Sequence, residues 1–210
     1  MSSSGAPAEG IFVAVTGPSG SGKTSVCKAL LAMFPRLRFS VSLTTRPPRP
    51  SEVDGEDYHF VSEAEFRERI RRGDLIEWAE NYGHLYGTSR EALEEALKGH
   101  DLLLDVDTRG ARALKKAWPG GLFVFIVPPS IEELERRLRA RGSETEETIR
   151  RRFDNAVREI REIVWYDYII INDELDAAID RLRAVYLAAT CRRERMMEKI
   201  KPFFDRSGGV

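Results

Sequence analysis

The chain has 210 residues, 42% of them hydrophobic, which is enough to form one domain with insertions or two small domains. Its 33 basic and 34 acidic residues leave a net charge of −1. This balance gives no global field that would attract nucleic acid or a membrane surface, and we expect neither as a partner. Any site for an anion must therefore be a local cluster of donors and positive charges.

The cysteines and the hydropathy pattern favour a reducing compartment, and we expect the cytoplasm. Two cysteines, Cys27 and Cys191, are too few for a disulfide framework. The sequence contains no run of 18 apolar residues and no segment typical of a signal peptide. The two ends are rich in small and polar residues, so residues 1–10 and 206–210 are expected to be flexible tails.

Apolar runs of strand length alternate with segments that begin with helix-capping residues. In chain order, we expect strands at Ile11–Thr16, Phe39–Leu43, Leu75–Tyr82, Asp101–Asp105, Leu122–Val127 and Tyr168–Ile171. Helices are expected at Lys23–Phe34, from Ser62 to Arg71, from Thr88 to about Gly99, from Ser130 to Gly142, at Thr145–Val164 and from Glu174 onward. This alternation predicts an α/β fold with a three-layer core and a five-stranded parallel sheet. The strand expected at Leu75–Tyr82 lies in a polar, hairpin-like stretch, Arg36–Arg90, that does not fit the alternation.

The segment Gly17–Thr24 reads G-P-S-G-S-G-K-T, a complete phosphate-binding loop of the form G-x-x-x-x-G-K-[ST]. It lies between an expected strand and an expected helix, which is the context that the motif requires. Lys23 can reach the β- and γ-phosphates of a nucleotide, and the Thr24 hydroxyl can bind Mg²⁺. The remaining loop residues are expected to direct backbone N–H groups at one phosphate chain: Gly17, Pro18, Ser19, Gly20, Ser21 and Gly22.

Two carboxylates, Asp105 and Asp107, lie at the end of the apolar run Leu102–Leu104. A carboxylate at the carboxyl end of a buried strand, beside a phosphate loop in the same sheet, is a common Mg²⁺ ligand. The alternative is that both residues only form the turn after the strand. The neighbouring phosphate loop favours the metal site.

A second cluster of anion-binding residues lies in the polar stretch after the first helix. Arg46 and Arg49 flank two prolines, which fix the backbone between them, and the planar guanidinium matches phosphate oxygens. Tyr58 and Tyr86 lie in the same stretch and can donate hydroxyl hydrogen bonds. Taken singly, each could be an ordinary surface or core residue. Together they suggest a second phosphate site, distinct from the loop at Gly17.

These motifs, with three further segments, resemble guanylate kinase from about Ile11 to Arg193. The segments are Gly17–Thr24, Phe39–Arg49, Gly55–Phe60, Ile76–Ala79, Tyr86–Thr88 and Asp105–Asp107. The run S-L-T-T-R-P-P-R and the later E-W-A and Y-G-T are specific, because other nucleoside monophosphate kinases share only the phosphate loop. The resemblance implies a P-loop kinase core with an inserted mixed β/α subdomain that binds GMP, and a helical lid.

The resemblance implies Mg²⁺-dependent transfer of the γ-phosphoryl group of ATP to GMP, and to dGMP, giving ADP and GDP. Glu77 would then pair with guanine N1–H and the exocyclic amine, because an ionised carboxylate only accepts hydrogen bonds. Adenine carries an acceptor at N1, which would face Glu77 unfavourably. The other implied substrate contacts are Arg46, Arg49, Tyr58 and Tyr86 at the GMP phosphate, Ser42 and Thr88 near guanine O6, and Asp107 near the base or the metal.

The resemblance also assigns residues to the transfer step, to Mg²⁺ and to ATP. The implied catalytic residues are Lys23, Arg46, Arg137, Arg141 and Arg152, the last three as arginines of the lid. Thr24 and Asp105 would hold Mg²⁺, and Asn172 would lie near the ATP base. One departure is visible at Arg109, which stands where the family usually has glutamine. It adds a positive charge beside the expected metal site and puts the detailed contacts of Asp107 in doubt.

We therefore divide the chain into a core at 11–35 and 91–205, an insertion at 36–90, and a lid at about 137–152 within the core. Two alternative functions remain. A non-catalytic binding module of the same fold is disfavoured by the complete phosphate loop. A kinase of another small phosphorylated acceptor is disfavoured by the guanine-type contacts of Ser42, Glu77 and Thr88. The sequence leaves the oligomeric state open between monomer and homodimer.

Overall fold

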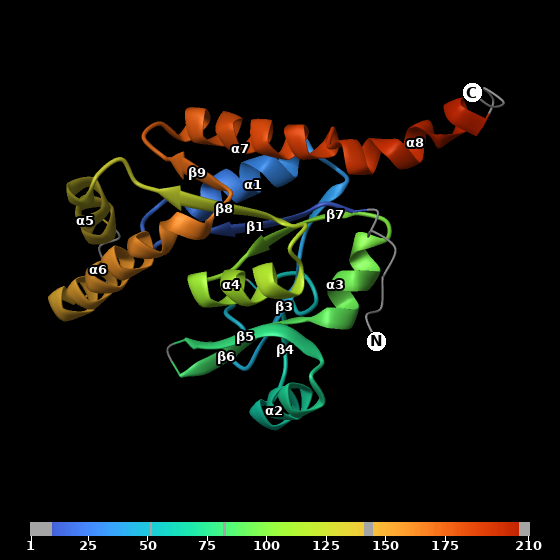
Figure 1. The fold of residues 1–210 in the computed structure, drawn as a ribbon. Helices are drawn as coiled ribbons and strands as arrows, with labels where there is room; N and C mark the ends of the chain where they lie inside the picture. The colour runs from blue at the N-terminus through green and yellow to red at the C-terminus, as the bar shows by residue number, and fades with distance from the viewer. Residues whose placement is uncertain (1–9, 51, 82, 141–144, 206–210) are drawn as a thin grey trace.

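A five-stranded parallel sheet forms the centre of the molecule, as expected from the sequence (Figure 1). The computed structural model describes residues 10–50, 52–81, 83–140 and 145–205. The strands lie side by side in the order β2 (Leu37–Phe39), β7 (Asp101–Asp105), β1 (Phe12–Thr16), β8 (Leu122–Val127) and β9 (Tyr168–Ile171). The α/β fold is confirmed, and the carboxyl ends of β1 and β7 lie next to each other at one edge of the sheet.

Helices cover both faces of this sheet and bury two separate hydrophobic clusters. Helices α1 (Lys23–Met33) and α7 (Leu175–Thr190) pack on one face, while α3 (Arg90–Leu97) and α4 (Thr108–Ala117) pack on the other (Figure 1). Side chains alternate between the faces, so Val13 belongs to the first cluster and Phe12 to the second. Burial on both sides explains why the central strands are continuous apolar runs.

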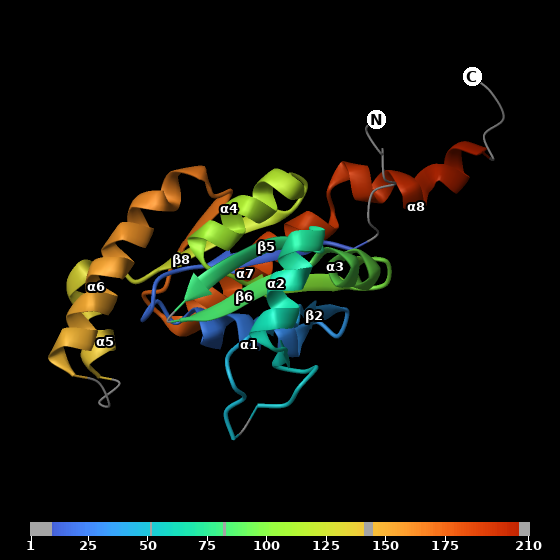
Figure 2. The ribbon, with the colours of Figure 1, turned by 90° about the horizontal axis from the view of Figure 1, so that it is seen from below.

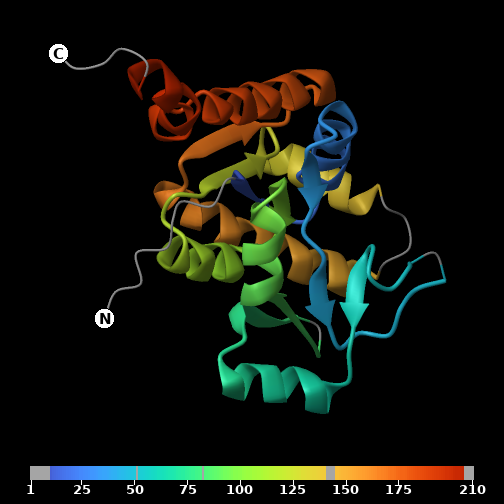
Figure 3. The ribbon, with the colours of Figure 1, turned by 90° about the vertical axis from the view of Figure 1, so that its right-hand side faces the viewer.

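A second, smaller sheet lies beyond α3 and α4 (Figures 1 and 3). Its strands run in the order β4 (Tyr58–Phe60), β3 (Ser42–Thr44), β6 (His84–Ser89) and β5 (Leu75–Asn81). The β3–β4 pair is parallel and the other pairs are antiparallel. This sheet and α2 (Glu63–Arg72) share a hydrophobic cluster of their own, made by Leu43, Phe66, Leu75 and Leu85.

The prediction of a single strand at Phe39–Leu43 is wrong. The chain forms two short strands there, β2 and β3, and they belong to different sheets. Alternating apolar residues continue through both strands, so the pattern indicates extended structure without marking the change of sheet. Residues 37–39 consequently lie in the core sheet, although we expected the insertion to begin at residue 36.

The remaining helices begin at capping residues that the sequence identifies. The Ser130 hydroxyl accepts a hydrogen bond from Glu133 N at 3.1 Å and starts α5 (Ile131–Arg139). The Thr145 hydroxyl accepts one from Thr148 N at 3.3 Å and starts α6 (Glu146–Ile160). Buried side chains of α5 and α6 form a further small cluster.

Three helical segments differ from expectation. The long helix expected to reach Val164 ends at Ile160 and continues as a 3-10 helix, η1 (Arg161–Trp165). The terminal helix is two helices, α7 and α8 (Arg193–Asp205), and α8 projects from the body of the molecule (Figure 2). Helix α4 was not expected, although Asp107 before it is a typical N-cap residue.

Among the described residues, no helix is both long enough and apolar enough to cross a membrane. The expected end of the fifth helix at Gly142 and the tails at 1–9 and 206–210 lie outside the described residues.

Candidate active site

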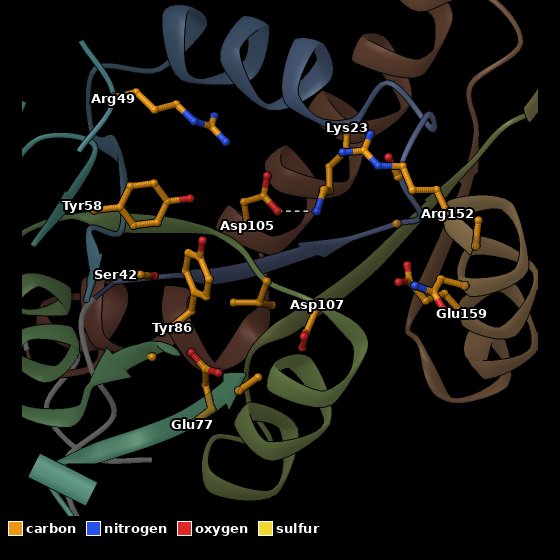
Figure 4. A pocket seen from close by; sticks show the side chains of 17 residues that line it. Lys23, Ser42, Arg49, Tyr58, Glu77, Tyr86, Asp105, Asp107, Arg152 and Glu159 are labelled. Carbon is orange, nitrogen blue, oxygen red and sulfur yellow. Dashed lines mark hydrogen bonds and ion pairs between the residues drawn. The ribbon is translucent and has the colours of Figure 1, made fainter. Parts of the chain in front are cut away.

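A cavity of about 410 Å³ lies where the core sheet, the second sheet and α6 face one another (Figure 4). Asp105 and Lys23 lie between Tyr86 and Glu77 on one side and Arg152 and Glu159 on the other. Eleven of the expected site residues line this cavity: Gly17, Ser19, Lys23, Ser42, Arg49, Tyr58, Glu77, Tyr86, Asp105, Asp107 and Arg152. The carboxyl ends of parallel strands and the segments that follow them are where α/β proteins usually bind ligands.

The phosphate loop has backbone angles that favour glycine. Gly20 and Gly22 adopt positive φ angles of 90° and 82°, and Ser21 N donates a hydrogen bond to Pro18 O at 3.0 Å. Gly17 is needed for a different reason: a Cβ there would lie 2.3 Å from Ile126 O of β8. Helix α1 begins at Lys23, near the end of the loop, so the positive end of the helix dipole faces the loop.

Asn172 holds the phosphate loop through a side-chain hydrogen bond. Its side-chain Nδ2 donates a hydrogen bond to Ser21 O at 2.7 Å, and its side chain is buried. Arg137 is held beside it, because one guanidinium nitrogen donates to Asn172 O at 3.0 Å and another pairs with Glu133 at 2.6 Å. Both residues border a second hollow with Gly20 and Gly22, and not the cavity that Lys23 lines.

Lys23 forms an ion pair and hydrogen bond with Asp105 at the end of β7. Burial alone would lower the pKa of Lys23, but the charge and hydrogen bond of Asp105 outweigh it, and the pKa is raised. Lys23 is therefore fully charged at neutral pH. Thr24 follows in the first turn of α1, where its side chain is exposed.

The metal ligands expected from the sequence are one carboxylate, Asp105, and one hydroxyl, Thr24. Among the described residues, no cluster of three or more His, Cys, Asp and Glu side chains is arranged to hold a metal ion. An oxygen-only pair still fits Mg²⁺, which is commonly bound through one or two carboxylates together with substrate phosphates and water.

Glu77 and Thr88 face each other across β5 and β6, in register. The Thr88 hydroxyl donates a hydrogen bond to Glu77 Oε1 at 2.7 Å, and Glu77 is only 8% exposed. Burial raises the pKa of Glu77 to about 7, the Thr88 hydrogen bond opposes this shift, and the negative charge of Asp107 adds to it. Thr88 itself is buried and does not line the cavity, so its direct partner in this structure is Glu77.

The arginines and tyrosines of the insertion are only partly gathered at the cavity. Arg49, Tyr58 and Tyr86 line it, and the two tyrosine rings meet edge to face with centroids 6.0 Å apart. Arg46 does not line it, because its guanidinium pairs with Glu52 at 2.8 Å. The sequence reasoning missed Glu52, which also accepts a hydrogen bond from Arg49 N at 2.8 Å.

Helix α6 contributes a face of the cavity that the sequence reasoning found only in part. Arg152 was expected, but Asn155 and Glu159 line the cavity as well. They lie three and seven positions after Arg152, a spacing that puts them on the same helix face and could have revealed them. Burial raises the pKa of Glu159 to about 7, with Lys23 opposing and Asp107 adding to the shift. Arg141 lies outside the described residues.

The geometry joins a positively charged phosphate-binding loop to a buried carboxylate in one cavity. Comparisons with known proteins show the family to which the chain belongs. A family model described as guanylate kinase matches residues 11–189. The guanylate kinase of Geobacter metallireducens is 50% identical over 198 residues, which cover 94% of this chain and 98% of that protein. That of Syntrophus aciditrophicus is 48% identical over 206 residues, with coverage of 98% and 99%.

A solved structure indicates the same family. The crystal structure of guanylate kinase from Anaplasma phagocytophilum is 32% identical in sequence and superposes with a TM-score of 0.70. The match covers 91% of this chain and 95% of that one. The likeness thus includes the core sheet, the second sheet and the helices around them. The chain belongs to the guanylate kinase family.

Proposed function

We propose that the protein transfers the γ-phosphoryl group of ATP to GMP, giving ADP and GDP, in the cavity described above. The observation that carries this proposal is that one cavity is lined both by Lys23 of the phosphate loop and by the buried carboxylate of Glu77. Lys23 suits the phosphates of a nucleoside triphosphate, and the Glu77 carboxylate suits the two adjacent N–H donors of guanine. Membership of the guanylate kinase family supports the same activity.

The phosphate loop is the proposed donor site. Its backbone N–H groups and the start of α1 attract the β- and γ-phosphates of ATP. Lys23 is charged and within reach of Asp105, so on ATP binding it would exchange a carboxylate partner for phosphate oxygens. Asn172 holds the loop through Ser21 O and also borders the second hollow. Its expected place near the ATP base stays a prediction.

Asp105 and Thr24 would hold Mg²⁺, because a carboxylate and a hydroxyl are suitable oxygen ligands for this ion. When bound, Mg²⁺ neutralises the charge that develops on the phosphate oxygens during transfer. The protein's own part is to present these two oxygens beside the phosphate loop, from the end of β7 and the first turn of α1.

The second sheet is the proposed acceptor site. Glu77 would accept hydrogen bonds from guanine N1–H and the exocyclic amine, with Ser42 on β3 near O6 and Thr88 fixing the carboxylate. Arg49, Tyr58 and Tyr86 would bind the GMP phosphate. Arg46 would join them only after leaving Glu52, and its position over the Tyr58 ring, 5.5 Å from the centroid, keeps it near that site.

The chemistry requires alignment and charge neutralisation rather than a general base. The phosphate of GMP has a second pKa of about 6, so at neutral pH it is already largely the dianion and can act as nucleophile. An oxygen of this phosphate attacks the γ-phosphorus of ATP, and ADP leaves with the electrons of the broken bond. Lys23 and Arg152 line the cavity and would balance the charge, with Arg137 and Arg141 as further candidates.

A coupled assay of ADP release tests the proposal with ATP, Mg²⁺ and a panel of GMP, dGMP, AMP, CMP and UMP. We expect GMP to exceed AMP in kcat/KM by roughly 10⁴, because a buried hydrogen-bonding site strongly rejects a base with the wrong donors. No turnover with any acceptor would identify a binding module instead. Turnover without base preference would identify a kinase of a different acceptor.

We also propose a cytoplasmic location, supported by the two cysteines. Cys27 and Cys191 are both free thiols, and Cys27 is buried among apolar residues of the core. Free thiols persist most readily in a reducing compartment. The oligomeric state, monomer or homodimer, stays a prediction from the sequence.

A further inference from the structure

Gly110 lies in the first turn of α4, directly beside the carboxylate of Glu77 on β5. A Cβ atom at position 110 would lie 2.7 Å from Glu77 Oε2 and 3.2 Å from Glu77 Cδ. Ordinary contacts between carbon and oxygen are about 3.3–3.6 Å long, so any side chain at this position would displace the carboxylate by at least about 0.6 Å. Only glycine lets Glu77 keep its position.

The backbone gives no other reason for glycine at position 110. It lies within an α-helix, where alanine is favoured over glycine. The described glycines that need positive φ angles are elsewhere: Gly20, Gly22, Gly55, Gly73 and Gly83. The helix therefore contains an unfavourable residue at a position where it approaches Glu77 closely.

Contacts on both sides determine where the Glu77 carboxylate lies. The Thr88 hydroxyl holds Oε1 at 2.7 Å, and the space beside Gly110 receives Oε2. Gly110 N also donates a hydrogen bond to Asp107 Oδ1 at 2.8 Å. Glu77 and Asp107 both line the cavity, so a single residue of α4 locates two of its carboxylates.

We propose that Gly110 is a positioning residue for base recognition. Its missing side chain lets α4 pack closely on β5, which holds the Glu77 carboxylate between Thr88 and the helix. The inference rests on the proposed reading of guanine by Glu77. A displacement of this size at a hydrogen-bonding group weakens the contact with the base but leaves the phosphate loop untouched.

The variant Gly110→Ala tests the inference, with Gly99→Ala as its control. A Cβ at Gly99 would meet nothing within 4 Å, and its φ is not in the positive range, so this change is neutral. For Gly110→Ala we expect the KM for GMP to rise at least about ten-fold and the GMP/AMP ratio of kcat/KM to fall, while the KM for ATP stays within two-fold. A folded Gly110→Ala variant with unchanged KM for GMP and unchanged ratio overturns the inference.

Thermal unfolding provides a second readout that does not depend on activity. If Gly110→Ala lowers Tm, the double variant Gly110→Ala, Glu77→Ala should recover much of the loss, because the colliding carboxylate is gone. The reference is Glu77→Ala alone. A Tm loss of the same size with and without Glu77 would show that the new methyl group collides with something else, and would overturn the inference.

Glu77→Gln separates failure of this inference from failure of the proposed function. If Glu77→Gln lowers the GMP/AMP ratio and Gly110→Ala does not, Glu77 reads the base but Gly110 does not position it. If Glu77→Gln leaves the ratio unchanged, the proposed guanine contact is wrong and the inference falls with it. If both variants lower the ratio, both proposals are supported.

Discussion

The two main walls of the cavity differ in how the chain builds them. The phosphate-loop wall comes from one continuous stretch, Gly17–Thr24, of which Gly17, Ser19 and Lys23 line the cavity. The opposite wall is assembled from all four strands of the second sheet, through side chains such as Ser42, Glu77 and Tyr86. The first wall depends on local backbone geometry, whereas the second depends on the pairing of strands that are distant in sequence.

The electrostatics of the two walls differ in the same way. Lys23 has a carboxylate partner, Asp105, and stays charged. Within the described part of the chain, Glu77 pairs with a hydroxyl, that of Thr88, and burial raises its pKa to about 7, so its ionised form is poorly stabilised. Guanine would bring the two N–H donors that an ionised carboxylate needs, whereas adenine would not. In the proposed mechanism, one wall supplies charge for the reaction, and the other supplies discrimination between bases.

Removing the lysine of the first wall should have the largest effect. Lys23→Ala is expected to lower kcat by about 10²–10³ or more, because a positioned charge at the transferring phosphoryl group is lost. The control is Lys28→Ala, at an exposed position of α1, which should leave kcat unchanged. The check is steady-state kinetics with circular dichroism to verify folding. Near-normal turnover in folded Lys23→Ala would remove Lys23 from the mechanism.

Neutralising the carboxylate of the second wall should alter base preference more than turnover. Glu77→Gln is expected to reduce the GMP/AMP ratio of kcat/KM by at least about 10², because an amide offers both a donor and an acceptor to the base. The matched control is Glu80→Gln, which changes an exposed residue of the same strand. Equal ratios in the wild type and Glu77→Gln would contradict the proposed division between the walls.

The raised pKa of Glu77 predicts a pH dependence that belongs to the second wall alone. The free protein must ionise Glu77 to accept from guanine, so kcat/KM for GMP should rise with pH and level off above about 7. The GMP phosphate also titrates, near pH 6. In Glu77→Gln, the pH profile of kcat/KM should keep only the step near pH 6 that belongs to the GMP phosphate. Identical profiles for wild type and Glu77→Gln would contradict the assignment of the upper step to Glu77.

The same shift has a consequence for stability. Because the folded-state pKa of Glu77 is raised above its ordinary value of 4.5, the folded state binds more protons between that pH and about 7. Glu77 therefore lowers stability progressively as pH rises through this window, and the loss is complete above it. Thermal melts should show Glu77→Gln gaining Tm relative to wild type from pH 5 to pH 8. A constant difference would contradict the raised pKa.

The smallest effect is expected at the support of the first wall. Asn172→Ala removes the buried hydrogen bond to Ser21 O, which should lower the unfolding free energy by about 1–3 kcal/mol. The KM for ATP should rise a few-fold and the KM for GMP should not change. Denaturant unfolding and kinetics measure both quantities. A raised KM for GMP would show that Asn172 acts on both walls.

The first wall could be predicted almost completely from the sequence. The phosphate loop is contiguous, and its strand and helix follow from local apolar patterns and from the glycines at Gly20 and Gly22. Support from residue 172 was harder to interpret, because a buried amide can contact either a ligand or the backbone. The structure shows the contact with Ser21, which the sequence does not reveal.

The second wall could be predicted only through its resemblance to a known family. Nothing local marks Glu77 as a buried acceptor, since its exposure depends on pairing with Thr88 and on packing beneath α4. The contact between Glu77 and Gly110 could likewise not be predicted from the sequence, because α4 itself was not expected. Arg46 lies over the Tyr58 ring, but its partner Glu52 depends on how the proline-rich loop turns back, which the sequence does not reveal.

A crystal structure with GMP bound would test the central claim most directly. The account predicts the guanine N1–H and exocyclic amine within hydrogen-bonding distance of the Glu77 carboxylate, and the phosphate beside Arg49 and Tyr58, facing Lys23. A guanine base bound away from Glu77, or a phosphate held by the loop at Gly17–Thr24 in place of the insertion, would contradict it.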